Sequence, residues 1–374
     1  MSIDSKLKKE GVEITQKLDT LKVNTVAVNI INKLIKAFPE HNFDSSKLFE
    51  LIARLNMYKA KMPGDLSGAK FVLKSGSIYF NDDLTIEEMS DVAVHECIHC
   101  IQHAYSSDSI LSSIGLCDKI TNVGLALNEA VVQLMASEAN GCKSQEETYF
   151  GISLKTISPN YYPLECKLAS EIAYFVGTFP LYHSTIYGDD IFKNTFILKT
   201  SKQTYSTIVR NFDKLLTLEN DLNFFVSELQ YADKPSTIKA LNNLINKHRN
   251  EIINTFFKTQ NLIIEKCFKN EFNNIRNLQD ITNFNKKIYN FKNIMGFCDG
   301  YEFYNVFYRK MMNLVQKKKF YIEQYGEINL YEEINQSLTI VDTSKNLLSF
   351  VTDFITKVKK LMKLNKDTED EINH

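Results

Sequence analysis

The chain has 374 residues, of which 44% are hydrophobic and 11% aromatic, and its formal net charge is -1. This length favours two domains, and the balanced charge argues against nucleic acid as a partner. The sequence has no run near the ~18 consecutive apolar residues of a membrane span, and its first residues lack the apolar segment of a signal peptide. Seven cysteines, an odd number, fit a reducing compartment. We therefore expect a cytoplasmic protein without a transmembrane segment.

The first 80 residues show two helical patterns and one hairpin. Apolar residues recur at three- and four-residue spacing over residues 24–38 and 45–61, which predicts two amphipathic helices. Two short apolar runs, FVL and IYF, lie on either side of KSGS. This arrangement predicts a β-hairpin.

Helix start and stop signals then predict two consecutive helices. Thr85 and Glu88 form a capping box, which predicts a helix over about residues 86–105. The pair Asn140-Gly141 is a stop signal, which predicts a second helix over about residues 122–139.

The composition of the sequence changes near residue 190. A helix is expected to begin near Pro163, and from about residue 192 glycine almost vanishes until Gly296 while helical periodicity continues. We predict an α+β, predominantly helical protein. An α+β domain is expected over residues 1–190 and an all-α domain over residues 191–374.

The stretch VAVHECIHCIQHAY, residues 92–105, contains the densest group of chemically active side chains. His95 and His99 are spaced i and i+4 on the predicted helix, about 40° apart, so both imidazoles can reach one tetrahedral ion. Glu96 can serve as a general base toward a water at that ion. The HExxH spacing therefore predicts a zinc site.

Three other side chains of this helix are not expected to bind the ion. Cys97 and Cys100 face largely away from the histidines, which favours core packing over a redox or metal pair. His103 lies about 12 Å along the helix axis from His95, too far to bind the same ion. We expect His103 to lie on a pocket wall or on the surface.

A catalytic zinc needs a third protein ligand from elsewhere in the chain. Glu129 is the favoured candidate, because it precedes an apolar run that would bury it against the histidine helix. Glu138 is the rival, but nine residues place it on the opposite side of the same helix. Both carboxylates cannot face the metal.

At these residues the chain resembles the gluzincin metallopeptidases. The matching segments are His95-Glu96-Cys97-Ile98-His99 and Asn128-Glu129. The resemblance implies a zincin-like catalytic domain in which His95, His99 and Glu129 bind Zn²⁺ and Glu96 activates the water. Gln133 departs from the pattern, because thermolysin-like members have an aspartate there that orients a zinc histidine.

Two further parts of such a site are expected. In zincins the strand before the metal helix is an edge strand that pairs with an extended peptide, and Ser77–Phe80 is placed for that role, although an ordinary hairpin strand fits equally. Hydrolysis also needs a donor to the developing oxyanion. His183 is the candidate, and the alternatives are Tyr149, Tyr161, Tyr162 and Tyr182.

The C-terminal half contains no catalytic constellation. Residues 347–366 predict a basic amphipathic helix that could contact a partner or a membrane surface, or pack as a core helix with solvated lysines. Residues 309–320 have the same ambiguity. We expect the helical half to pack against the catalytic domain and to narrow access to the zinc.

These observations predict a zinc metallopeptidase that acts on a peptide or protein substrate. One alternative is a catalytically inactive zincin-fold protein that binds a partner or acts as a scaffold, motivated by Gln133 and by the unassigned oxyanion donor. Another is an effector peptidase delivered into a different cell.

Overall fold

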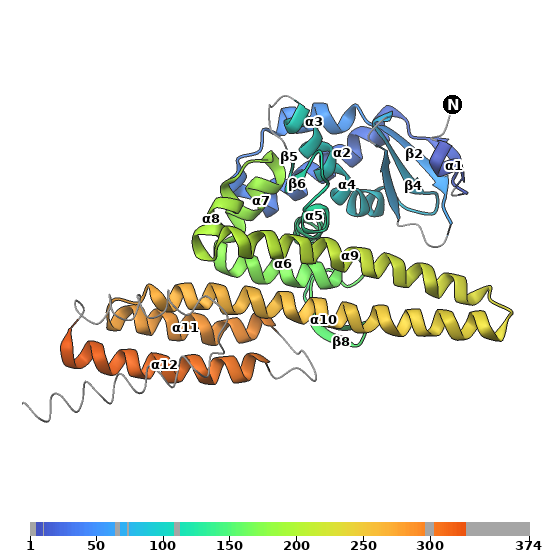
Figure 1. The fold of residues 1–374 in the computed structure, drawn as a ribbon. Helices are drawn as coiled ribbons and strands as arrows, with labels where there is room; N and C mark the ends of the chain where they lie inside the picture. Colours follow the sequence, from blue (N-terminus) through green and yellow to red (C-terminus); the bar gives the residue numbers. More distant parts are fainter. Residues whose placement is uncertain are drawn as a thin grey trace, which may run out of the picture. The chain divides into compact units, whose positions relative to one another are not determined.

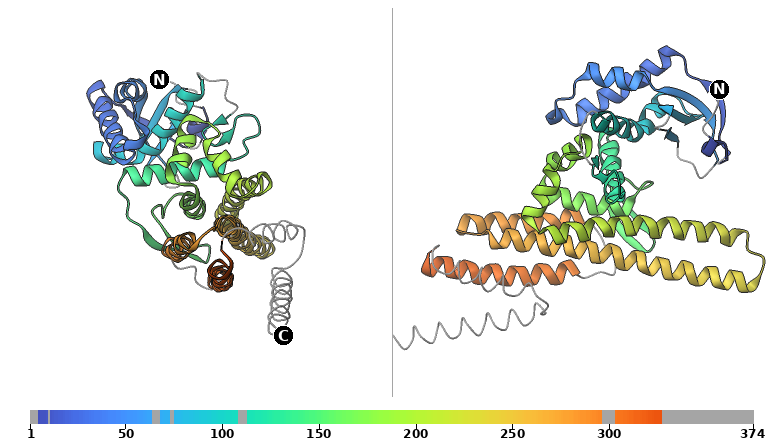
Figure 2. Two further views of the ribbon diagram at one scale, coloured as in Figure 1. Left: turned by 90° about the vertical axis from the view of Figure 1, so that its left-hand side faces the viewer. Right: turned by 45° about the horizontal axis from the view of Figure 1, so that its top comes forward.

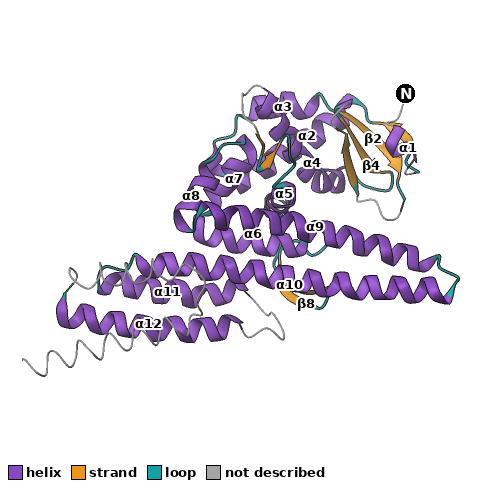
Figure 3. Ribbon diagram, viewed as in Figure 1, coloured by secondary structure: helices purple, strands orange, loops and turns teal. Residues whose placement is uncertain are grey.

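Helices dominate the computed structural model of the protein, and strands form only small sheets (Figures 1 and 3). The structure describes residues 5–9, 11–63, 68–72, 75–107, 113–295 and 303–326. The expectation of a predominantly helical chain that also contains β-sheet is confirmed. Two compact units are present, Met1–Asn270 with Ile288–Val306, and Glu271–Lys287 with Phe307–His374. The boundary expected near residue 190 lies inside the first unit, and the assignment of a function to each domain stays a prediction.

The four-stranded sheet of the first unit contains β1 (Glu13–Lys17), β2 (Asn56–Lys61), β3 (Ala69–Val72) and β4 (Ser77–Asn81). Its order is β1-β2-β4-β3, with β2 and β4 parallel and the other neighbours antiparallel. The β3–β4 pair confirms the predicted hairpin. The edge role expected for Ser77–Phe80 is wrong, because β4 lies between two strands and is buried. Among the described strands, β3 forms the edge of the sheet next to β4, and β1 forms the opposite edge.

The expected helix over residues 45–61 is correct only in its first half. Helix α3 (Ser45–Ala53) begins after Asp44, whose carboxylate accepts hydrogen bonds from two backbone N–H groups. The chain then enters β2, which pairs with β1 on one side and with β4 on the other. Both partners are distant in sequence, so local periodicity could not indicate them. Helix α2 (Thr20–Ala37) confirms the other amphipathic helix.

Two helices begin and end at the predicted signals. Helix α4 (Ile86–Ser107) follows the capping box, in which the Glu88 carboxylate accepts the Thr85 N–H at 2.8 Å and the Thr85 hydroxyl accepts the Glu88 N–H at 3.3 Å. Helix α5 (Leu125–Ala139) is followed by Gly141, whose φ is +68°. Helix α4 packs against α2, α3 and the sheet, and α5 packs against α4.

The other described elements complete the chain. They are α1 (Ser5–Lys9), the 3₁₀ turn η1 (Pro39–His41), β5 (Ser113–Ile114), β6 (Cys117–Asp118), β7 (Gln145–Tyr149), β8 (Ile152–Thr156), α6 (Pro163–Val176), α7 (Thr178–Tyr187), α8 (Ile191–Lys199), α9 (Lys202–Gln230), α10 (Pro235–Asn273), α11 (Leu278–Met295) and α12 (Phe303–Tyr325). Helix α6 begins at Pro163, as expected. Figure 2 shows α9 and α10 as long helices that run side by side. Within the described ranges, no helix has both the length and the apolar composition of a membrane span.

The two basic segments of the C-terminal half have different outcomes. Residues 347–366 lie outside the described residues. Residues 309–320 belong to α12, where Met311 and Val315 are buried. Lys318 is also buried, and its ammonium group donates to the Phe272 carbonyl at 2.9 Å. This face of α12 is therefore a packed face with solvated lysines beside it.

Helix α9 packs against both α5 and α6 in the first unit. This contact buries two carboxyl groups, Glu165 of α6 and Glu219 of α9. Among the described residues, neither oxygen of Glu165 has a hydrogen-bond partner, and one oxygen of Glu219 also lacks one. Burial raises the pKa of Glu165 to about 7. Burial, followed by the charge of Glu165, raises the pKa of Glu219 well above its usual value.

The Glu165 pKa predicts how stability changes with pH. Folding takes up a proton between about pH 4.3, the ordinary glutamate pKa, and the folded-state value, so stability falls as pH rises through this range. We expect the difference in unfolding free energy between Glu165→Gln and the wild type to shift in favour of the variant by more than ~2 kcal/mol from pH 5 to pH 8. Urea denaturation at both pH values measures this difference. Glu228→Gln, at an exposed position of α9, is the control, and parallel pH profiles for Glu165→Gln and the wild type would contradict the prediction.

Candidate metal centre

Helix α4 places His95 and His99 one turn apart on the same face. Their Nε2 atoms lie 3.1 Å apart, and their rings meet edge to face at 71° with centroids 4.8 Å apart. The i, i+4 spacing brings both Nε2 atoms to one point beside the helix, as the sequence predicts.

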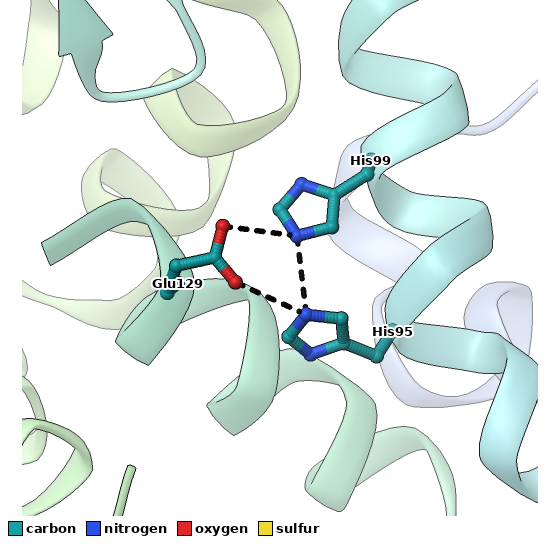
Figure 4. A group of neighbouring side chains, drawn as sticks. All are labelled: His95, His99 and Glu129. Carbon is teal, nitrogen blue, oxygen red and sulfur yellow. Dashed lines mark hydrogen bonds and ion pairs between the residues drawn. The ribbon is translucent and has the colours of Figure 1, made fainter. Parts of the chain in front are cut away.

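Glu129 approaches this point from α5 (Figure 4). One carboxylate oxygen lies 3.3 Å from Nε2 of His95, and the other lies 3.3 Å from Nε2 of His99. Two ligands of a tetrahedral zinc, each about 2.1 Å from the ion, are about 3.4 Å apart. The three side chains, each 16% exposed, therefore have the donor types and the separations that a zinc site needs.

The remaining ring nitrogens are held by two amides. Nδ1 of His95 donates to the Gln133 side-chain oxygen at 2.9 Å, and Nδ1 of His99 donates to the Gln102 side-chain oxygen at 2.9 Å. The Gln102 orientation is fixed, because its nitrogen donates to the Thr185 carbonyl, which can only accept. With Nδ1 protonated, a neutral imidazole presents its Nε2 lone pair toward Glu129. Gln102 is a residue that sequence reasoning missed.

A buried amide network connects α4 and α5, the two helices that carry the cluster. The Gln102 nitrogen also donates to Oδ1 of Asn128 at 2.9 Å, and this oxygen accepts the Leu116 N–H at 3.0 Å. Gln102 and Asn128 are almost fully buried. Because Asn128 immediately precedes Glu129, the bond that orients His99 belongs to the same network that holds the start of α5.

The titration of the cluster reflects mutual stabilisation of charge. Burial alone would lower the pKa of His99, but the hydrogen bond and charge of Glu129 outweigh it and raise the pKa to about 9. Burial alone would raise the pKa of Glu129, but hydrogen bonds from His95 and His99 hold it well below its usual value. The Glu129 carboxylate is thus ionised and attracts a cation. Without a metal, the proton of His99 supplies the positive charge beside it.

A cavity of about 260 Å³ lies beside the cluster. Glu96, His95 and Gln133 line it, together with the start of β3 and the loop that ends at Tyr162. The Tyr162 and His95 rings are stacked with centroids 6.4 Å apart. Burial, followed by the Glu129 charge, raises the pKa of the Tyr162 hydroxyl. Among the described residues, those that line this cavity all fall within 68–162. Helix α9 of the helical half packs against α5 and α6 as expected, and the expected narrowing of access to the zinc stays a prediction.

Several predicted residues lie outside the cluster. Glu138, the rival ligand, accepts a hydrogen bond from the Tyr182 hydroxyl at 2.6 Å. His183 is paired with Asp189 at 2.8 Å and packs against Tyr187. The structure thus places His183 in another group, and its role as oxyanion donor stays a prediction.

The other candidates on the histidine helix and among the tyrosines are also placed. Cys97 and Cys100 are buried, which confirms core packing. His103 is half-buried and is not part of the three-residue cluster found among the described side chains. Tyr161 lines the cavity, whereas Tyr149 packs against Phe150.

Comparisons of the chain with protein-family models, with curated proteins and with solved structures find no match. The functional interpretation therefore depends on the chemistry of the cluster and of the cavity beside it.

The amide network leads to a stability prediction at Gly115, whose φ is +55°. A Cβ atom there would lie 2.2 Å from Oδ1 of Asn128 and 2.4 Å from Nε2 of Gln102. We expect Gly115→Ala to lower the free energy of unfolding by at least ~2 kcal/mol more than Gly76→Ala, because it also disrupts buried hydrogen bonds. Gly76 has φ +56° with nothing within 4 Å of its added Cβ, so it isolates the backbone cost. Equal losses in urea denaturation would show that the network tolerates displacement.

Proposed function

We propose that this protein is a zinc metallopeptidase that hydrolyses peptide bonds. The convergence of His95, His99 and Glu129 at separations of 3.1–3.3 Å is the observation that carries the proposal. Two imidazoles and one carboxylate form the ligand set of catalytic zinc in metallopeptidases, with one position left for water or substrate. The same residues carry the gluzincin resemblance, and a zincin-like fold is part of the proposal.

Zinc, when bound, polarises a carbonyl group and lowers the pKa of water. The chain supplies the remaining groups. Glu96 lines the cavity beside His95, where its carboxylate can accept a proton from water and pass it to the leaving amine. Tyr162 is a described tyrosine whose ring stacks on His95. Burial and then the charge of Glu129 raise the pKa of its hydroxyl, which places this hydroxyl close to the cluster. We propose that Tyr162 donates to the developing oxyanion.

The substrate we propose is an extended peptide that pairs with β3. This strand is the sheet edge nearest the cavity, since Ala69 lines the cavity and begins β3. Backbone pairing with an edge strand holds a peptide without regard to most of its side chains. We also place the protein in the cytoplasm, because the six described cysteines are unpaired.

One alternative is supported by a specific observation. Both histidines are held by neutral amides, Gln133 and Gln102, instead of a carboxylate. A carboxylate partner raises the basicity of a ligand imidazole, and an amide does so less. The alternative is a zinc-binding scaffold without peptidase activity.

Metal analysis and peptide cleavage test the proposal together. We expect one zinc per wild-type chain, loss of zinc in His95→Ala and Glu129→Ala, and retention in Glu138→Ala, which removes a glutamate from the same helix. Glu96→Gln should keep zinc and lower kcat more than ~100-fold against a peptide library, because it removes the general base.

The outcomes separate the two functions. Zinc bound to the wild type without cleavage of any peptide would favour the scaffold. A wild-type protein without zinc, or zinc retained in both ligand variants, would overturn the metal site itself.

A further inference from the structure

Asp213 of α9 forms a contact that reaches the start of the ligand helix α5. Its two carboxylate oxygens accept the backbone N–H of Gly124 at 2.8 Å and that of Ala126 at 3.0 Å. Asp213 is 89 residues from Gly124 in the sequence. These are charge-assisted hydrogen bonds at the positive end of the helix dipole, where a carboxylate is most favourable.

Helix α5 needs a cap from outside its own sequence. Its N-cap residue is Gly124, with φ +93°, and a Cβ atom there would lie 2.6 Å from the Leu116 carbonyl oxygen. The serine, threonine, aspartate and asparagine side chains that normally cap a helix are therefore excluded from this position. Asp213 accepts the Ala126 N–H, which such a side chain would satisfy, and also accepts the N–H of Gly124 itself.

The capped turn directly precedes the ligand. Glu129 lies five residues after Gly124, about one and a half turns along α5. Its neighbour Asn128 is held by the amide network on one side of the turn, and Asp213 holds the first N–H groups through α9. Loss of the cap frees the first turn, and its fraying displaces the carboxylate that must meet both histidines.

We infer that Asp213 is a positioning residue of the metal centre, acting on zinc affinity through the first turn of α5 and Glu129. The inference rests on the proposed zinc site. It makes α9, a helix outside the predicted catalytic domain, part of the structure that sets the ligand geometry. Outer-shell partners of metal ligands typically contribute 10- to 100-fold to affinity.

The test measures the zinc dissociation constant of the full chain by competition with a chelator, well below the unfolding temperature. We expect Asp213→Ala to weaken zinc binding at least ~10-fold. Asp213→Asn, which keeps one acceptor oxygen, should have an intermediate constant. Leu222→Ala is the matched control, because it removes a buried side chain of α9 nine residues after Asp213 and keeps both Asp213 hydrogen bonds to the start of α5.

Hydrogen exchange of the metal-free protein gives a second reading that does not need zinc. Amide exchange at Gly124 and Ala126 should be faster in Asp213→Ala than in the wild type, and it should not be faster in Leu222→Ala. The exchange rates of the α4 amides should be the same in Asp213→Ala as in the wild type. Wild-type zinc affinity in Asp213→Ala would overturn the inference and leave the proposed function intact. A wild-type chain that binds no zinc would overturn the proposed function and this inference with it.

Discussion

The crossing of α4 and α5 places the Glu129 carboxylate between two imidazoles, and the surrounding structure is organised around this contact. A carboxylate that is largely withdrawn from water is costly unless it is paired and hydrogen-bonded. His95 and His99 supply that pairing at 3.3 Å each. The contact requires that two helices keep a fixed separation, so their ends and their outward faces must be held as firmly as the three side chains.

Neutral amides do much of this holding. Gln133 and Gln102 orient the two imidazoles without adding negative charge. A carboxylate in either place would increase the electron donation of the imidazole and would add a second anion beside Glu129. With amides, the group of two imidazoles and one carboxylate carries one formal negative charge, so a divalent ion bound there would keep a net positive charge. Such an ion would be held less tightly than one beside a further carboxylate.

The site could be predicted from sequence where its determinants are local. The positions of His95, Glu96 and His99 follow from helical spacing, and the capping box predicted the start of their helix. The strand β2 was missed because its stability comes from pairing with β1 and β4, which lie far away in the chain. Asp213 was missed because its partners, the N–H groups of Gly124 and Ala126, are brought close only by tertiary packing. Gln102 lies three residues after His99 on α4, so helical spacing could have indicated this contact, whereas its contacts with Asn128 and Thr185 come from tertiary packing.

The scarcity of glycine and the continuous helical periodicity after about residue 190 indicate long helices. They do not indicate where such helices pack. Polar residues within those helices are more informative, since a carboxylate on a packed helix face needs a partner or a raised pKa. Helix α9 shows both cases. Asp213 has partners in the N–H groups at the start of α5, and Glu219, beside Glu165, has a raised pKa. Acidic residues on the apolar stripe of α9 are therefore signs that the helix packs against α5 and α6.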